Sequence, residues 1–362
     1  MGCVEPSSAG RTFGHTGAIM MNLPAALELA LFQGKHRLTE EEKISEETPA
    51  PQDMRSFAEF QQAFKTQLAW LIDQAVTLNN HLGKIYQQRH PFPMMSALME
   101  GCLENGKDVI QGGAKYNSSG AGMIGLAEVV DSLTAIEEFV FGTGPDTVSF
   151  PEMIRAINSN WEGNESHKKL QEKIKKFPDK FGTDGPRAKE HANWLIRFLH
   201  YYFQGKENYR GGKYTVGYWT MTMHAGFGAL SRALPSGRKD KESFPSGITP
   251  VSGAAPDLPE VLHFVADLNP TFIANGQALN LKFFPGIEAP KYAHCIEAFF
   301  RMGGLQVQSN IIDADTLRSI RDCPGSHPHL MVRVSGYSAY FQDLNPKMQE
   351  EIIKRAEYDL KC

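Results

Sequence analysis

The chain has 362 residues, of which 41% are hydrophobic and 10% aromatic, enough to build a large core. Its formal net charge is −4 at pH 7, so the chain lacks the excess of basic residues that is typical of proteins that bind nucleic acid or an anionic membrane. No apolar stretch approaches the length of a bilayer span, and the first ten residues lack the charged-then-apolar build of a signal peptide. We therefore expect neither nucleic acid nor membrane as a partner.

The first half of the chain predicts mainly helices. Residues 2–13 are rich in Gly, Pro and Ser and indicate a loop, and residues 21–32 predict a helix with Pro24 in its first turn. Residues 36–52 are charged and end in prolines, which indicates an exposed connection. A long helix should follow, because Ser56 and Glu59 form a capping-box pattern. One apolar face of that helix consists of Phe57, Phe60, Phe64, Leu68, Leu71 and Val76.

Residues 108–125 (DVIQGGAKYNSSGAGMIG) are glycine-rich and precede a second helical pattern, which runs from Val129 to Val140. They lack the GKS/GKT ending and the GxGxxG spacing of nucleotide loops, so we interpret them as a tight-turned loop that lines a cavity. Glu137 and Glu138 fall on the hydrophilic side of the helix and are expected to be solvated. Residues 166–180 indicate an exposed lysine-rich segment, and residues 188–203 predict an amphipathic helix.

The second half of the chain predicts alternating strands and helices. Residues 211–253 indicate mostly loop. The expected order after them is a strand near Phe272, a helix over 291–302, a strand over 305–312, a short helix to Arg321, a strand over 330–334 and a helix over 345–358. Strands that alternate with helices favour a parallel α/β sheet or barrel.

The five cysteines, Cys3, Cys102, Cys295, Cys323 and Cys362, are odd in number and widely spaced, with no CxxC. This pattern argues against a disulfide scaffold and against a zinc site, and it favours a reducing cytoplasm. The histidines lack metal-ligand spacing as well. We therefore predict no bound metal and a structural role for His224, His327 and His329.

Cys3 and Glu5 lie two residues apart in the loop GCVEP, so an extended backbone would point both side chains to the same side. A neighbouring carboxylate raises the pKa of a thiol, which is the opposite of what a cysteine protease needs. A protonated thiol beside a base would instead suit hydrogen-atom transfer followed by proton removal. An ordinary loop cysteine remains the alternative from this loop alone.

Gly336 interrupts the β-branched and aromatic run MVRVSGYSAYFQDL. A Gly inside such a run marks a bulge, a tight turn or the close approach of another backbone. By itself it does not indicate chemistry.

Taken together, GCVEP at residues 2–6 and RVSGYSAYF at residues 333–341 resemble the paired signatures of the glycyl radical enzymes. The resemblance continues through GGAKYNSSG, DSLTAIEEFVF, ALPSGRKDKESFPSGITPVSG and NGQALNLKFFPG, so it covers essentially the whole chain. It implies that a radical-SAM activating enzyme removes an α-hydrogen from Gly336, that Cys3 becomes the thiyl radical that attacks a small-molecule substrate, and that Glu5 is the base. No further bound cofactor is implied. A Cβ would crowd a planar Cα radical, and Gly has none.

The resemblance also implies a ten-stranded α/β barrel in a homodimer. Members are about twice this long, so we interpret the chain as the C-terminal half of such an enzyme. We expect residues 1–240 to be the C-terminal part of the barrel domain and residues 241–362 to be the glycyl radical domain. The 362-residue chain by itself is expected to be inactive.

The sequence indicates the reaction less clearly than it indicates the family. Val4 follows Cys3, whereas the formate acetyltransferase branch has two adjacent cysteines, so the Cys-x-Glu pattern favours a dehydratase or decarboxylase. The Trp-His-Asp run of diol dehydratases is replaced by Gly14-His15-Thr16-Gly17, which removes a group expected to bind a substrate hydroxyl. Two alternatives stay open: formate C-acetyltransferase-type activity, and a non-catalytic radical-domain fragment that docks on a partner chain.

Overall fold

The computed structural model describes residues 5–39 and 42–358. The helices are α1 Leu23–Leu31, α2 Phe57–Arg89, α3 Pro93–Ala97, α4 Cys102–Asn105, α5 Leu126–Phe139, α6 Phe150–Asn158, α7 Glu165–Lys176, α8 Pro186–Gln204, α9 Met223–Leu230, α10 Leu258–Ala266, α11 Ala289–Arg301, α12 Ala314–Asp322 and α13 Pro346–Lys354. The strands are β1 His15–Asn22, β2 Ser119–Ile124, β3 Tyr214–Gly217, β4 Leu279–Phe283, β5 Val307–Ile311, β6 Met331–Arg333, β7 Ser338–Tyr340 and β8 Glu357–Tyr358.

The strands form two parallel sheets, in the orders β1-β2-β3 and β5-β4-β8. The two sheets are linked where a parallel bridge joins Tyr218 to Gln277, just after β3 and just before β4. Tyr218 donates its N–H to Gly276 O at 2.9 Å and accepts at its own carbonyl from Ala278 N at 2.9 Å. The expected α/β class with parallel strands is therefore confirmed. A separate antiparallel hairpin, β6-β7, carries the RVSGYSAY motif.

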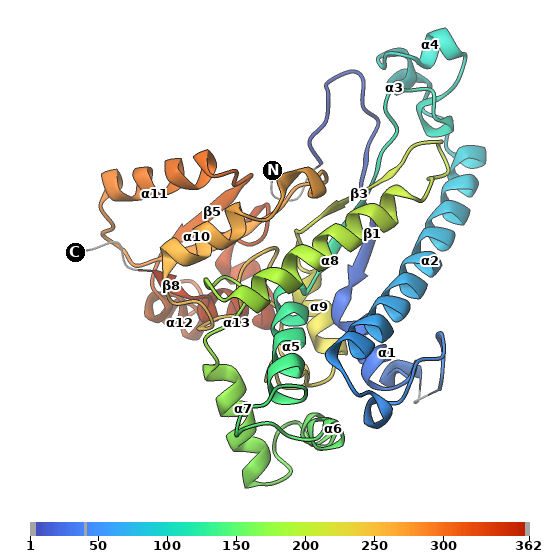
Figure 1. The fold of residues 1–362 in the computed structure, drawn as a ribbon. Helices are drawn as coiled ribbons and strands as arrows, with labels where there is room; N and C mark the ends of the chain where they lie inside the picture. The colour runs from blue at the N-terminus through green and yellow to red at the C-terminus, as the bar shows by residue number, and fades with distance from the viewer. Residues whose placement is uncertain (1–4, 40–41, 359–362) are drawn as a thin grey trace.

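Figure 1 shows how the helices surround these sheets. Helices α2 and α8 flank β1 and β3, and α10 to α13 gather around β5 and β8. Helices α3 and α4 stand beyond one end of α2, whereas α6 and α7 lie at the opposite end of the molecule. None of the helices in the described ranges combines the length and apolarity needed to cross a bilayer.

The glycine-rich segment that we interpreted as a loop contains the central strand of the first sheet. All six residues of β2, Ser119–Ile124, are buried. A Cβ on Gly120 would lie 2.2 Å from Asn275 Nδ2, and one on Gly122 would lie 3.1 Å from Met20 Sδ. Glycine therefore lets side chains from neighbouring segments approach this strand, which is a reason for Gly inside a strand.

The prediction of mostly loop over residues 211–253 was also incomplete, because these residues contain β3 and α9. The strand near Phe272 was misplaced: Pro270–Phe272 is a 3-10 turn, and the strand is β4, seven residues further on. Strand β1 was not foreseen at all. Its sequence, HTGAIMMN, does not alternate polar and apolar residues, so it gives no period-2 signal.

The longer helices match the sequence prediction closely. Ser56 accepts from Glu59 N at 3.3 Å at the start of α2, while the Glu59 carboxylate accepts from Arg55 N at 2.7 Å instead of from the cap residue itself. Helices α5, α8, α11, α12 and α13 each lie within a few residues of the predicted bounds. Pro24 stands in the first turn of α1 as expected.

Glu137 and Glu138 are not solvated as expected but half-buried, because α8 packs against α5 at this point. His191 Nε2 lies 2.8 Å from Glu137 Oε2, and Arg187 pairs with Glu138. The His191 hydrogen bond and the Arg187 ion pair thus join α5 to α8, which explains why both carboxylates are half-buried.

Candidate functional site

Of the three residues predicted from the paired motifs, Glu5 and Gly336 are described and Cys3 lies outside the described residues. Glu5 is buried, with 4% of its surface exposed. Its backbone N–H donates to Thr16 Oγ1 at 3.2 Å, and its Oε1 accepts from Thr215 Oγ1 at 3.0 Å. Glu5 is thereby held against β1 and β3.

The other carboxylate oxygen of Glu5 is buried and has no hydrogen-bond partner among the described residues. A Cβ on Gly14 would lie 2.5 Å from this Oε2 and 3.3 Å from Ser118 Oγ, so only glycine leaves room for the carboxylate here. A buried polar atom without a partner is costly unless another group or a reaction uses it. In the described part of the chain, no hydrogen bond offsets the burial of Glu5 Oε2.

A buried guanidinium balances the charge of this region. Arg210 donates to Ser118 O and, at 3.1 Å, to Tyr209 OH, and it stacks over the Phe13 ring with 5.1 Å to the centroid. Burial lowers the pKa of Arg210, while Tyr209 and then Glu5 act in the opposite direction. Guanidinium groups keep their proton in proteins, so Glu5 lies in the field of a fixed positive charge.

Gly336 occupies a tight turn, which is one of the three structures its sequence context allowed. Strands β6 and β7 pair on either side, and Val334 N donates to Tyr337 O at 2.9 Å across the turn. The φ of Gly336 is 88°, in the left-handed region that side chains with a Cβ adopt reluctantly. Glycine is thus required by the backbone of this turn, independently of any chemistry.

Buried polar side chains hold the turn from several elements. Arg355, just after α13, donates to Val334 O at 2.6 Å and to Arg333 O at 3.1 Å. Its guanidinium is paired with Glu351 at 2.8 Å. Gln308 on β5 accepts from Gly336 N at 3.1 Å. The turn is therefore anchored largely through its backbone.

One short segment connects the two predicted sites. Thr215 on β3 contacts Glu5, and Thr220 Oγ1 donates to Ser335 Oγ at 3.1 Å, beside Gly336. Five residues of extended chain span at most about 17 Å. Residues from opposite ends of the sequence are thus brought to the two ends of residues 215–220.

His224 on α9 is fully buried and its Nε2 lies 3.5 Å from Glu351 Oε2. Burial raises the pKa of Glu351, but the charges of Arg355 and His224 outweigh it and hold this pKa at about 2. Neither ring nitrogen of His224 has a hydrogen-bond partner among the described residues, so its structural role stays a prediction. His327 and His329 are exposed. Among the described residues, no group of three or more His, Cys, Asp or Glu side chains could hold a metal ion.

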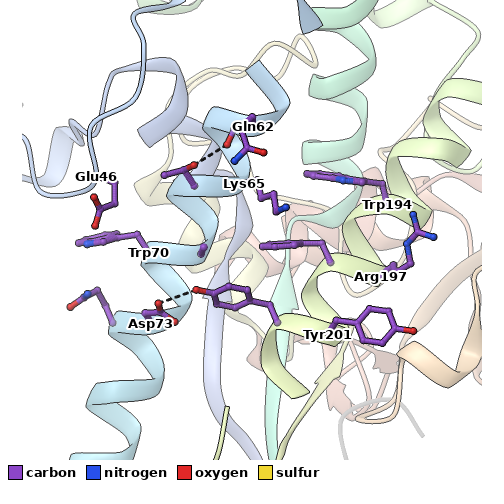
Figure 2. Close-up of a pocket in the computed structure, with 13 residues that line it drawn as sticks. Glu46, Gln62, Lys65, Trp70, Asp73, Trp194, Arg197 and Tyr201 are labelled. Atoms are coloured by element: carbon purple, nitrogen blue, oxygen red, sulfur yellow. Dashed lines mark hydrogen bonds between the residues drawn. The ribbon is translucent and has the colours of Figure 1, made fainter. Parts of the chain in front are cut away.

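Neither Glu5 nor Gly336 lines the two cavities described here. One, of about 960 Å³, runs between α2 and α8, and Figure 2 shows its aromatic lining, including Trp70, Trp194 and Tyr201. The other, of about 820 Å³, is lined by α5, residues 236–254 and α13. The Gly-rich residues 112–122 line neither cavity, so the lining role expected for them is not seen in these two.

Sequence reasoning missed the residues that support the site: Thr16, Arg210, Thr215, Thr220, Gln308 and Arg355. No local pattern marks them, because each contacts a segment remote in sequence. Arg333 and Ser335 were inside the quoted motif but were given no role.

Comparison with known proteins gives two family matches. Residues 1–228 match the family described as Pyruvate formate lyase-like, and residues 244–342 match the family described as Glycine radical. The first match contains the motif at residues 2–6, and the second contains the motif at residues 333–341.

Two curated relatives of the chain are dehydratases. The chain is 31% identical over 362 residues to a trans-4-hydroxy-L-proline dehydratase of Clostridioides difficile, covering 98% of this chain and 45% of the relative. It is 28% identical over 368 residues to a (2S)-3-sulfopropanediol dehydratase of Klebsiella oxytoca, covering 99% of this chain and 44% of the relative. The chain therefore spans less than half the length of these relatives.

Among solved structures, the glycerol-bound B12-independent glycerol dehydratase from Clostridium butyricum superposes with a TM-score of 0.91 at 28% identity. The match covers 99% of this chain and 45% of that one. The similarity in fold thus extends over both sheets and the β6-β7 hairpin.

Proposed function

This chain belongs to the glycyl radical enzymes, and we propose that it carries the radical machinery of a lyase: Gly336 stores the radical, Cys3 attacks the substrate and Glu5 handles a proton. The observation that carries the proposal is the buried Glu5 carboxylate, one oxygen of which has no partner among the described residues. It lies at one end of residues 215–220, while the Gly336 turn is held at the other end.

The proposed relay balances without an external redox partner once the radical is present. The Cys3 S–H bond gives its hydrogen atom to the Gly336 Cα radical, which leaves a thiyl radical. The thiyl radical takes a hydrogen atom from a substrate C–H bond, and the substrate radical then loses its leaving group. The product radical takes the hydrogen atom back from Cys3. In a dehydration, Glu5 Oε2 accepts the proton that the substrate releases and returns it to the departing hydroxide, which leaves as water. Proton transfer of this kind contributes roughly 10²–10⁴-fold to the rate.

The proposed reaction is an elimination or decarboxylation of a small organic substrate, with dehydration favoured by the similarity to the two dehydratases above. Val4 follows Cys3 where the formate acetyltransferase branch has a second cysteine, which argues against formate C-acetyltransferase-type activity. Thr16 stands where the diol dehydratase pattern has Asp, and its hydroxyl is engaged with Glu5 N at 3.2 Å. We therefore propose that substrate hydroxyl binding differs here from that in the diol dehydratases.

We place catalysis in the complete protein, because the chain spans under half the length of its relatives. A radical-SAM activating enzyme is the proposed source of the radical, and a homodimer the proposed assembly. Residues 1–240 and 241–362 remain our proposed division into barrel part and glycyl radical domain. Cys102, Cys295 and Cys323 are free thiols, which supports a reducing, cytoplasmic location.

The test is anaerobic activation of the complete protein with its activating enzyme and S-adenosylmethionine. A glycine-centred doublet in the EPR spectrum is expected, and Gly336→Ala should abolish it. Gly325→Ala is the matched control, because Gly325 also has a positive φ, of 96°, with open space around its Cα. An unchanged doublet in Gly336→Ala would refute the assignment.

A further inference from the structure

We propose that Gln308 is the positioning residue for the radical carbon: its side-chain oxygen holds the N–H of Gly336 and so sets the plane of the peptide next to Cα. Gln308 lies on β5 and is buried. Its Oε1 accepts from Gly336 N at 3.1 Å and from Arg333 Nη2 at 2.9 Å. This inference rests on the proposed role of Gly336.

The orientation of the Gln308 amide follows from its partners. Arginine has donors and no acceptor, so the atom that faces Arg333 must be the oxygen. The Gln308 nitrogen donates to Asn280 Oδ1. Asn280 in turn donates from Nδ2 to Ser246 O at 3.2 Å and to Ser246 Oγ at 3.0 Å, which fixes its oxygen towards Gln308. The hydrogen bonds of Gln308 and Asn280 thus direct the Gln308 side-chain oxygen towards the N–H of Gly336.

Gln308 differs from the other residues that hold the turn. Arg355 binds the carbonyls of Arg333 and Val334, and Thr220 binds the side chain of Ser335. In the described part of the chain, the side-chain hydrogen bond to the backbone of Gly336 itself comes from Gln308. The contact therefore acts on the peptide group that is bonded to the reacting carbon.

The chemical consequence concerns delocalisation. When the Cα–H bond of Gly336 breaks and the hydrogen atom leaves, the unpaired electron spreads onto both neighbouring peptide groups only if their planes align with the singly occupied orbital. A fixed acceptor on the N–H restrains one of those planes. It also shifts electron density towards the nitrogen, since hydrogen bonds polarise the groups they join. At a φ of 88° the peptide plane on the nitrogen side is not yet aligned with that orbital, so we expect the acceptor to hold this peptide group in place while the rest of Gly336 turns towards coplanarity as the radical forms. The held N–H and its polarisation should together stabilise the radical.

The first experiment measures hydrogen exchange of the Gly336 amide in the complete, unactivated protein. Gln308→Met removes the acceptor with little change of shape and should speed this exchange by about tenfold, as for the loss of one buried hydrogen bond. Gln308→Glu keeps an oxygen for Gly336 and Arg333 and should restore slow exchange. Gln306→Met is the matched control, because Gln306 accepts from Leu279 N and does not contact the turn.

The second experiment records the EPR doublet of the same variants after activation. Gln308→Met should lower the radical yield per protomer severalfold and change the hyperfine splitting, whereas Gln308→Glu and Gln306→Met should resemble the wild type. Wild-type yield and splitting in Gln308→Met would overturn the proposal. So would identical behaviour of the Met and Glu variants, because the acceptor would then not matter.

The two experiments separate the inference from the proposed function. If the wild type gives no doublet, the radical role of Gly336 fails, while the exchange measurement still shows whether Gln308 holds its N–H. If Gln308→Met does not fold, Gln308→Asn keeps the amide but shortens its reach, and it should speed exchange at Gly336 in the same way. Slow exchange in Gln308→Asn would contradict the assignment.

Discussion

The hydroxyls of Thr220 and Ser335 share a hydrogen bond of 3.1 Å, and both side chains are fully buried. Thr220 Oγ1 also accepts from Gly247 N at 3.2 Å. One hydroxyl thus joins the end of the β3 segment, the loop at residue 247 and the turn that carries Gly336. Such a junction is sensitive to loss of a single atom, because two partners are left unsatisfied.

Thr220→Val should lower the free energy of unfolding by about 1–3 kcal/mol, because it leaves Gly247 N–H without its acceptor and Ser335 without its donor. Ser335→Ala removes only one partner of Thr220 and should cost less. Denaturant unfolding of the two variants in the same background gives the comparison. An equal or larger loss in Ser335→Ala would show that the Gly247 contact contributes nothing.

Glu5→Gln should leave the EPR doublet intact and lower turnover by roughly 10²–10⁴-fold, because the amide cannot accept the proton. Thr215→Val is the companion variant: it removes only the 3.0 Å hydrogen bond to Glu5 Oε1 and keeps the carboxylate. Its effect on turnover should be much smaller. Near-normal turnover in Glu5→Gln would assign proton transfer to another residue.

The stability of the protein should fall as pH rises from about 4.5 to about 7 because of Glu128. Burial raises the pKa of Glu128 from 4.5 to about 7, although Arg238 and the 2.6 Å hydrogen bond from Ser236 oppose the rise. The folded state therefore binds this proton more tightly than the unfolded state. The stabilisation by this proton is fully present below pH 4.5 and is lost as the pH rises through 7. The free energy of unfolding should differ by on the order of 3 kcal/mol between the two conditions.

Glu128→Gln tests this dependence, because the amide keeps an oxygen for Ser236 and does not ionise. Unfolding temperatures measured from pH 4 to pH 8 should fall less steeply in the variant. Asp131, whose pKa burial raises to about 6, contributes in the same direction and leaves a residual slope. Parallel curves for variant and wild type would mean that Glu128 does not titrate in this range.

The 362-residue chain should self-associate in a concentration-dependent way. Large apolar side chains are exposed together on the second half of α2 and on the segment of α3 and α4: Leu78, Leu82, Ile85, Tyr86, Phe92, Met94, Met95, Leu98 and Leu103. Exposed apolar surface of this extent favours association. The double substitution Leu82→Gln and Met94→Gln should raise the monomer fraction in sedimentation velocity. Phe300→Gln on α11 is the control, and a monodisperse wild-type monomer would contradict the prediction.

The sequence by itself determined most of the longer helices and the family. The capping pattern at Ser56 predicts the start of α2, and apolar spacing predicts α5, α8 and α11 to α13, because capping and periodicity are local properties. The motifs at the two ends predicted Cys3, Glu5 and Gly336 as a set, because short motifs can be read without knowing which segments meet in space; their roles stay a prediction.

Only the tertiary structure decided which strands form the sheets and what surrounds the site. Strand β2 is built from glycines that sequence reasoning assigns to a loop, and it is stable because β1 and β3 pair with it on both sides. The contacts of Glu5 with Thr215 and of Gly336 with Gln308 likewise depend on pairing between segments remote in sequence. A single local pattern cannot encode such contacts, because each is fixed by the packing of the whole sheet.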